Sequence, residues 1–153
     1  MENRFAYLLR VRYVECDAQQ VVFFGRYAEY ADIAVTEFLR QIWGNYTDLT
    51  EQGMDNHVVH LSVDYRSPAR FDDVLALHVG CTHVGKTSYT LTVDVRNHMS
   101  DQLLATIKLV YVMISTGTHD KLSIPPNMGA ALEKGAPGVV TDHAGAVVFN
   151  PSP

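Results

Sequence analysis

The chain has 153 residues, a length typical of one domain whose core folds without disulfides or metals. Its formal net charge of −5 and the lack of a basic stripe argue against a nucleic-acid-binding protein. The 2 cysteines are too few for a disulfide framework, and no run of 18 apolar residues predicts a membrane span. Because no signal-peptide pattern precedes the first strand, we expect a cytoplasmic protein that contacts neither membrane nor nucleic acid.

The first predicted elements are a strand and a long helix. Residues 5–14 alternate between apolar and polar side chains, as a strand does. Residues 25–43 follow a helical period instead, and Gly44 with Asn45 supplies the expected stop. The apolar stripe of this helix consists of Tyr27, Tyr30, Ala31, Ala34, Phe38 and Ile42. Such a helix is about 27 Å long, enough to cross a whole sheet.

Four further strands are predicted after Gly53, at residues 59–65, 75–81, 89–95 and 103–114. Short turns join them, so we expect the strands to form antiparallel hairpins. With the first strand they make a five-stranded antiparallel sheet and one long helix, an α+β fold. A short helix capped by Asn127 follows, and then a tail rich in Gly, Pro and Ala whose role the pattern leaves open.

The most informative position for function is Asp17. It precedes an apolar loop, Val21–Gly25, that leads directly into the long helix. Free backbone N–H groups at a helix N-terminus can stabilise an oxyanion, and a carboxylate close by can attack or activate water. The apolar flanks favour a partly dry site. The alternative is an ordinary loop aspartate that caps or turns the chain.

The run from Tyr13 to Tyr30 resembles the signature of the hotdog-fold acyl-CoA thioesterases of the 4-hydroxybenzoyl-CoA thioesterase family. The resemblance extends over about residues 5–128. It implies a hotdog fold, with one long central helix wrapped by the five-stranded sheet, a domain at 1–128 and a C-terminal extension at 129–153. It also implies hydrolysis of an acyl- or aroyl-CoA thioester to free acid and CoA, with no cofactor, since CoA is part of the substrate. The implied assembly is a homodimer or homotetramer with the site at the subunit interface.

The resemblance also implies roles for individual residues. Asp17 is the catalytic nucleophile or general base, and the backbone N–H groups of Phe24 and Gly25 are the oxyanion donors. The family usually has glycine where this chain has Gln20, so a left-handed turn there would strain Gln20; alternatively, its side-chain amide binds substrate. The other substrate-binding candidates are Tyr27, Arg66, Lys86 and Ser88. For Tyr27 the alternative is core packing, and for Lys86 it is a solvated surface position.

Three alternatives stay open at this point. Glu37 would be the catalytic carboxylate in a second branch of hotdog thioesterases, unless it simply pairs with Arg40. A metal site is not expected, because His57 and His60 are three apart on a predicted strand and therefore face opposite sides. Finally, the departure at Gln20 favours a non-catalytic hotdog module that binds acyl-CoA or another apolar ligand.

Overall fold

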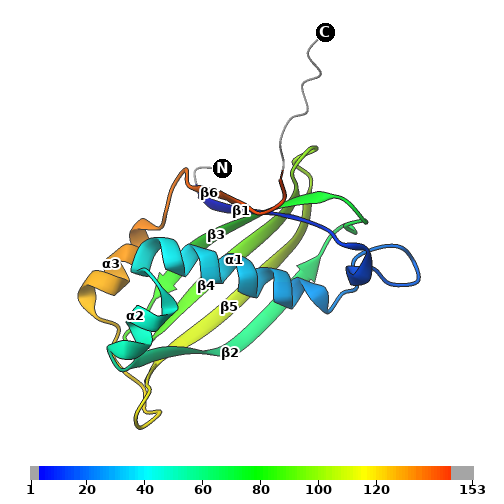
Figure 1. Ribbon diagram of the computed structural model, residues 1–153. Coiled ribbons are helices and arrows are strands. Elements are labelled where there is room, and N and C mark those ends of the chain that lie inside the picture. Colours follow the sequence, from blue (N-terminus) through cyan, green and yellow to red (C-terminus); the bar gives the residue numbers. More distant parts are fainter. Residues whose placement is uncertain (1–3, 146–153) are drawn as a thin grey trace.

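The computed structural model describes residues 4–145, and a curved sheet with one long helix dominates it (Figure 1). The helices are α1 (Arg26–Trp43), α2 (Tyr46–Glu51) and α3 (Pro126–Lys134), and a 3-10 turn, η1, spans Tyr13–Glu15. The strands are β1 (Phe5–Arg10), β2 (Met54–Tyr65), β3 (Val74–Val84), β4 (Ser88–Asn97), β5 (Leu103–Ser115) and β6 (Val140–Asp142). The long helix and all five predicted strands are therefore present, although the first strand ends at Arg10 and not at residue 14.

The sheet has six strands in the order β2-β5-β4-β3-β1-β6. The five strands β1 to β5 pair antiparallel, as expected, but β6 pairs parallel to β1, so the sheet is mixed. The prediction of a five-stranded antiparallel sheet thus needs this correction. The physical reason is that the chain after α3 returns along β1, where Ala6 N–H donates to Val139 O and His143 N–H donates to Leu8 O.

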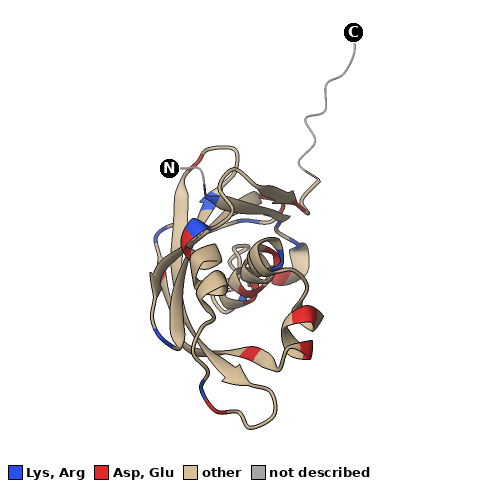
Figure 2. Cartoon of the chain, turned by 90° about the vertical axis from the view of Figure 1, so that its left-hand side faces the viewer, with Lys and Arg blue, Asp and Glu red and all other residues tan. Residues whose placement is uncertain are grey.

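Helix α1 lies inside the curve of the sheet, and Figure 2 shows it nearly end-on with the strands around it. Its buried residues repeat every three or four positions, because that spacing places them on one face. They are Tyr27, Tyr30, Ala31, Ala34, Val35 and Phe38. Together with inward-facing residues of the strands they form the main core. Burying a side chain as large as Phe38 contributes about 2–3 kcal/mol, so the stripe anchors α1 along its length.

The C-terminal part of the described chain packs on this core. Leu132 of α3 and Ala136 beyond it belong to the main hydrophobic cluster. Tyr7 Oη and His143 Nδ1 lie 2.9 Å apart and share a hydrogen bond next to β6. The expected domain boundary at residue 128 falls within α3, so residues 129–145 are continuous with the folded unit. The rest of the predicted extension, 146–153, lies outside the described residues.

Helix α2 was not expected from the sequence. It follows α1 after Gly44, whose φ of +87° ends the first helix. Asn45 N–H donates to Asp48 Oδ2 at 3.1 Å, a bond typical of a helix start. Leu49 then anchors α2 in a small cluster at this end of α1. Among the helices of residues 4–145, none is long and apolar enough to cross a membrane.

Candidate active site

A tight hairpin carries Asp17. Cys16 pairs with Val22 across it, and Asp17 N–H donates to Val21 O at 2.9 Å. The turn closes where Gln20 N–H donates to Asp17 O, also at 2.9 Å. Gln20 has a φ of +64°, the left-handed conformation that favours glycine. The strain expected from the missing glycine is therefore present in the backbone.

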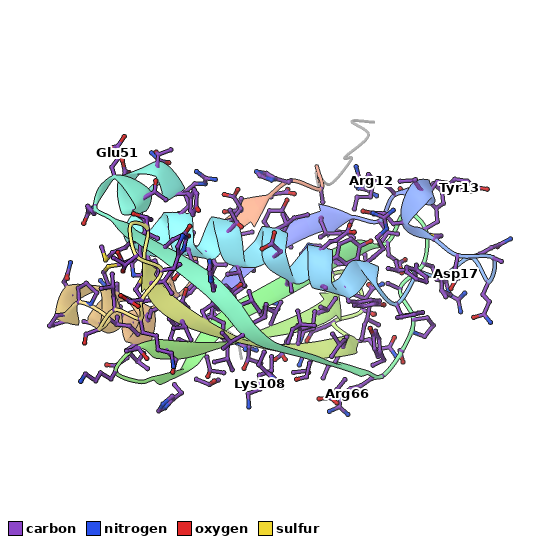
Figure 3. All side chains as sticks on the ribbon, turned by 90° about the horizontal axis from the view of Figure 1, so that it is seen from below. Arg12, Tyr13, Asp17, Glu51, Arg66 and Lys108 are labelled. Carbon is purple, nitrogen blue, oxygen red and sulfur yellow. The ribbon has the colours of Figure 1, made fainter. Side chains whose placement is uncertain are left out.

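The Asp17 side chain is half-exposed, on a loop at one end of the molecule that also holds Arg12 and Tyr13 (Figure 3). Asp17 Oδ1 accepts a hydrogen bond from Gln19 N–H at 2.8 Å, and Oδ2 accepts none from a described residue. One oxygen thus stabilises the turn and the other is available to a ligand. The partly dry surroundings expected from the sequence do not form within one chain, because Phe23 and Phe24 are 44% and 66% exposed.

Two backbone N–H groups at the start of α1 have no partner among the described residues. Phe23 N–H donates to Glu15 O and Arg26 N–H donates to Phe23 O, each at 2.9 Å. Between them, the N–H groups of Phe24 and Gly25 donate to no described residue, and no side chain caps the helix at Gly25. Unsatisfied N–H groups at a helix N-terminus are suited to an anionic oxygen. These are the two donors that the sequence singled out.

Glu15, which the sequence analysis missed, lies buried beside this hairpin. Its carboxylate accepts hydrogen bonds from Arg12 N–H (2.8 Å), Arg12 Nη2 (3.0 Å) and Tyr30 Oη (3.0 Å). Burial acts to raise the pKa of Glu15, but these hydrogen bonds and the Arg12 charge outweigh it and lower the pKa. Tyr30 in turn has a raised pKa, because it is buried and faces the carboxylate. The spacing of Arg12 and Glu15, which resembles a helix cap, was the available signal.

A groove of about 250 Å³ lies beside Phe24 and holds two more of the predicted residues, Tyr27 and Arg66. Tyr65 Oη donates to Phe24 O at 2.8 Å, so the end of β2 holds the start of α1 in place. The Tyr27 ring lies edge-on to the Tyr65 ring, with centroids 5.2 Å apart, and is only 3% exposed. Tyr27 is thus mainly a core residue whose edge reaches the groove. Arg66 lies at the same end of the molecule as Asp17 (Figure 3).

Lys86 and Ser88 lie at the other end of α1. Ser88 pairs with Val112 of β5, and Ile124 N–H donates to Lys86 O at 2.8 Å. Next to them, Tyr89 contacts Trp43, the last residue of α1, with centroids 5.6 Å apart. A helix of 18 residues is about 27 Å long. Within one chain these two candidates are therefore separated from Asp17 by the length of α1.

A second groove, of about 440 Å³, follows the C-terminal half of α1. Its apolar walls include Val35, Leu39, Trp43 and Leu49, and its polar lining includes Asn56. Its size and composition fall within the range of small-molecule sites. This groove lies on the same half of α1 as Lys86 and Ser88, away from the Asp17 hairpin.

The structure also bears on two of the open alternatives, catalysis by Glu37 and a metal site. Glu37 Oε2 accepts a hydrogen bond from Arg40 Nε at 3.2 Å, and the side chain of Glu37 is about one-fifth exposed. Its carboxylate is therefore engaged in an ion pair on the helix. Within residues 4–145, no group of three or more His, Cys, Asp and Glu side chains lies close enough together to hold a metal ion.

Known thioesterase sequences are similar to this chain. A family model described as the thioesterase superfamily matches residues 19–102. The acyl-CoA thioesterase YbgC of Haemophilus influenzae is 28% identical over 134 residues, covering 86% of this chain and 96% of that protein. The acyl-CoA thioester hydrolase YbgC of Escherichia coli is 31% identical over 93 residues, covering 61% of this chain and 69% of that protein.

Solved structures share the fold. A 1,4-dihydroxy-2-naphthoyl-CoA thioesterase from Synechocystis superposes with a TM-score of 0.76 at 22% identity, covering 84% of this chain and 94% of that one. At this identity the likeness concerns the fold alone, and it agrees with the predicted hotdog architecture. The family model matches residues 19–102, more than half of the chain, and begins two residues after Asp17. The predicted family and the predicted enzyme class, a thioester hydrolase, are therefore confirmed, and the chain belongs to the thioesterase superfamily.

Proposed function

We propose that this chain hydrolyses acyl-CoA thioesters, with Asp17 as the catalytic carboxylate and the start of α1 as the oxyanion site. The observation that carries the proposal is that the Asp17 hairpin and the start of α1 directly after it supply the two parts. Asp17 Oδ2 and the N–H groups of Phe24 and Gly25 are all without partners among the described residues. YbgC proteins of Haemophilus influenzae and Escherichia coli are named for this acyl-CoA chemistry, which supports the same substrate class here.

The proposed reaction begins when the thioester carbonyl oxygen accepts hydrogen bonds from the N–H groups of Phe24 and Gly25. Asp17 then attacks the carbonyl carbon directly, or removes a proton from the water that attacks it. The C–S bond breaks, CoA leaves as the thiolate and takes up a proton, and water supplies the second oxygen of the acid. Each oxyanion donor is worth roughly 3–4 kcal/mol in the transition state. Water suffices as co-reactant, so the proposal includes no cofactor.

The proposed enzyme is a dimer joined through strand β2. This strand is an edge of the sheet and runs for 12 residues with only β5 beside it. Val58, Val59 and Leu61 are 49%, 61% and 41% exposed along it. A long apolar edge strand is normally covered or paired with another chain. A two-fold axis through this edge would pair two copies of β2 antiparallel, and assembly into a tetramer is compatible with it.

Such a dimer would complete the site. Antiparallel pairing sets the Tyr65 end of one β2 beside the Met54 end of its partner. The Asp17 hairpin of one subunit would then face the 440 Å³ groove of the other, near that subunit's Lys86 and Ser88. We assign the acyl group to the groove, and CoA to Arg66 of one chain with Lys86 and Ser88 of the other. Gln20 is assigned a contact with the thioester through its side-chain amide.

The test is turnover of a panel of short, medium and aromatic acyl-CoA thioesters, followed by release of free thiol. Asp17→Asn keeps the shape of the side chain but removes its basicity and nucleophilicity. We expect kcat to fall about 10²-fold or more with the fold intact. Glu37→Gln is the matched control on the helix and should retain most of the activity.

Three results would contradict the proposal. Near-normal kcat in Asp17→Asn would remove that residue from the reaction, and loss of activity in Glu37→Gln instead would move the reaction to the helix carboxylate. Binding of every acyl-CoA without thiol release would favour the non-catalytic module that the strained Gln20 backbone suggests.

A further inference from the structure

We infer that Glu15 is a positioning residue for this reaction, holding the Asp17 hairpin and the oxyanion donors in register with α1. The inference rests on the proposed function, because its kinetic effect requires thioester hydrolysis. Glu15 is only 4% exposed, so it reaches no substrate itself. It acts instead through its two ends, a side chain bonded to α1 and a backbone carbonyl bonded to the loop that precedes the helix.

The side chain of Glu15 joins η1 to the long helix. Tyr30 is 1% exposed within α1, so its hydroxyl is a fixed point that donates to Glu15 Oε1 at 3.0 Å. On its other side the carboxylate of Glu15 accepts hydrogen bonds from the backbone N–H and the guanidinium of Arg12. Hydrogen bonds to a charged carboxylate are stronger than those between neutral groups, and burial strengthens them further. The base of the hairpin is thereby tied to the helix it precedes.

The backbone of Glu15 anchors the segment directly before the oxyanion donors. Its carbonyl accepts from Phe23 N–H at 2.9 Å, while Phe23 O accepts from Arg26 N–H at 2.9 Å. A trans peptide is planar, with its C=O and N–H pointing opposite ways. Because Phe23 O points into the first turn of α1, the N–H of Phe24 points away from that turn. Glu15 therefore holds the Val22–Phe23 peptide, which directly precedes the peptide that carries the first donor.

The same residue controls the other catalytic part. Cys16, directly after Glu15, forms the bridge to Val22, and Asp17 follows at once. Displacement of Glu15 would shift both Asp17 and the Phe24 N–H relative to α1. Displacements of about 1 Å at this distance from the chemistry can lower the rate 10²-fold. A residue of this kind should affect kcat far more than KM.

The experiment compares Glu15→Ala with a matched variant, Asp94→Ala. Asp94 is also a paired carboxylate, bonded to Arg4 at 2.6 Å and to Thr106 at 3.1 Å. It lies on β4 opposite His78 of β3, and among the described residues its side chain bonds neither to the hairpin nor to α1. We expect Glu15→Ala to lower kcat about 10- to 100-fold with KM within threefold. Asp94→Ala should lower the thermal midpoint with kcat within twofold of wild type. Glu15→Gln should recover at least about tenfold of the loss, because its Oε1 can still accept from Tyr30 and from Arg12 N–H.

Two outcomes overturn the inference: kcat within twofold of wild type in Glu15→Ala, or an equal loss of kcat in Asp94→Ala. If Glu15→Ala does not fold, Tyr30→Phe removes one hydrogen bond only and should still lower kcat several-fold at unchanged KM. If wild type releases no thiol from any acyl-CoA, the proposed function fails, and amide exchange then tests the positioning role alone. Exchange at Asp17 and Phe23 should quicken in Glu15→Ala but not in Asp94→Ala, and equal rates in both would overturn it.

Discussion

Gln20 shows how far one residue of the site follows from the sequence. The expected glycine position is indeed left-handed, with a φ of +64°, and Gln20 is exposed there. The sequence indicated the conflict between Gln20 and a left-handed backbone, because the surrounding motif usually has glycine at this position. It did not reveal Glu15, because a buried carboxylate depends on Tyr30, a partner 15 residues away in another element. Local geometry was predictable and the tertiary hydrogen bond was not.

The strain at Gln20 gives a prediction with two readouts. Gln20→Gly should raise the free energy of unfolding by about 0.5–1 kcal/mol, because glycine adopts positive φ without a steric cost. The same change removes the proposed amide contact with substrate, so KM should rise several-fold, as expected for one hydrogen bond. Denaturant unfolding and steady-state kinetics on one preparation measure both. A more stable variant with unchanged KM would exclude Gln20 from substrate binding.

At the scale of elements, the apolar period predicted α1 and the five long strands well. Such elements bury one face along many residues, so their pattern is strong. The three missed elements, η1, α2 and β6, have three, six and three residues, and η1 replaces the end of the strand predicted to reach residue 14. Strand β6 exists because β1 offers a free edge beside it, which no pattern within Val140–Asp142 encodes. Short elements defined by tertiary pairing are thus the part that sequence periodicity cannot supply.

The start of α1 allows a direct test of the backbone donors. Gly25→Pro deletes one N–H, and the φ of −70° at this position already suits proline. Proline also restricts Phe24, so the variant probes both donors together. We expect kcat to fall at least about tenfold while KM changes less, since the donors matter most once the oxyanion forms.

The matched control for this variant is Gly25→Ala. An added Cβ lies 2.8 Å from the Phe23 ring in either variant, so both displace the same exposed side chain. Only proline removes the N–H. Equal kcat in the two variants would mean that the oxyanion is stabilised elsewhere, and Gln20 would be the next candidate to examine.

At the scale of the whole molecule, the chain separates residues that the sequence grouped in one site. Asp17 and Arg66 lie at one end, whereas Lys86 and Ser88 lie beside Val112 and Ile124 at the other. Neither composition nor motif spacing encodes such distances. In the proposed dimer, pairing of two β2 strands would bring Asp17 and Arg66 of one chain close to the Lys86 and Ser88 of the other.

If the dimer forms through β2, positive charges on this edge strand should prevent it from forming. Val59→Lys combined with Leu61→Lys should prevent pairing of β2, because lysine on an edge strand opposes addition of another strand. We expect light scattering to shift from an oligomer of at least twice 17.1 kDa to the monomer, with loss of thioesterase activity. Val140→Lys is the control, an exposed apolar position on β6 at the opposite edge. An active double variant that remains monomeric would refute the shared site.

Subunit mixing tests the central claim, a site shared between Asp17 of one chain and the groove of another. Asp17→Asn removes the carboxylate, and Thr36→Trp fills the groove from an exposed position on α1. Each variant alone should be nearly inactive. After subunit exchange, half of the dimers should be mixed, and each mixed dimer holds one intact site, so about a quarter of wild-type activity should return. A mixture no more active than its two parents would place Asp17 and its groove in the same chain and contradict the account.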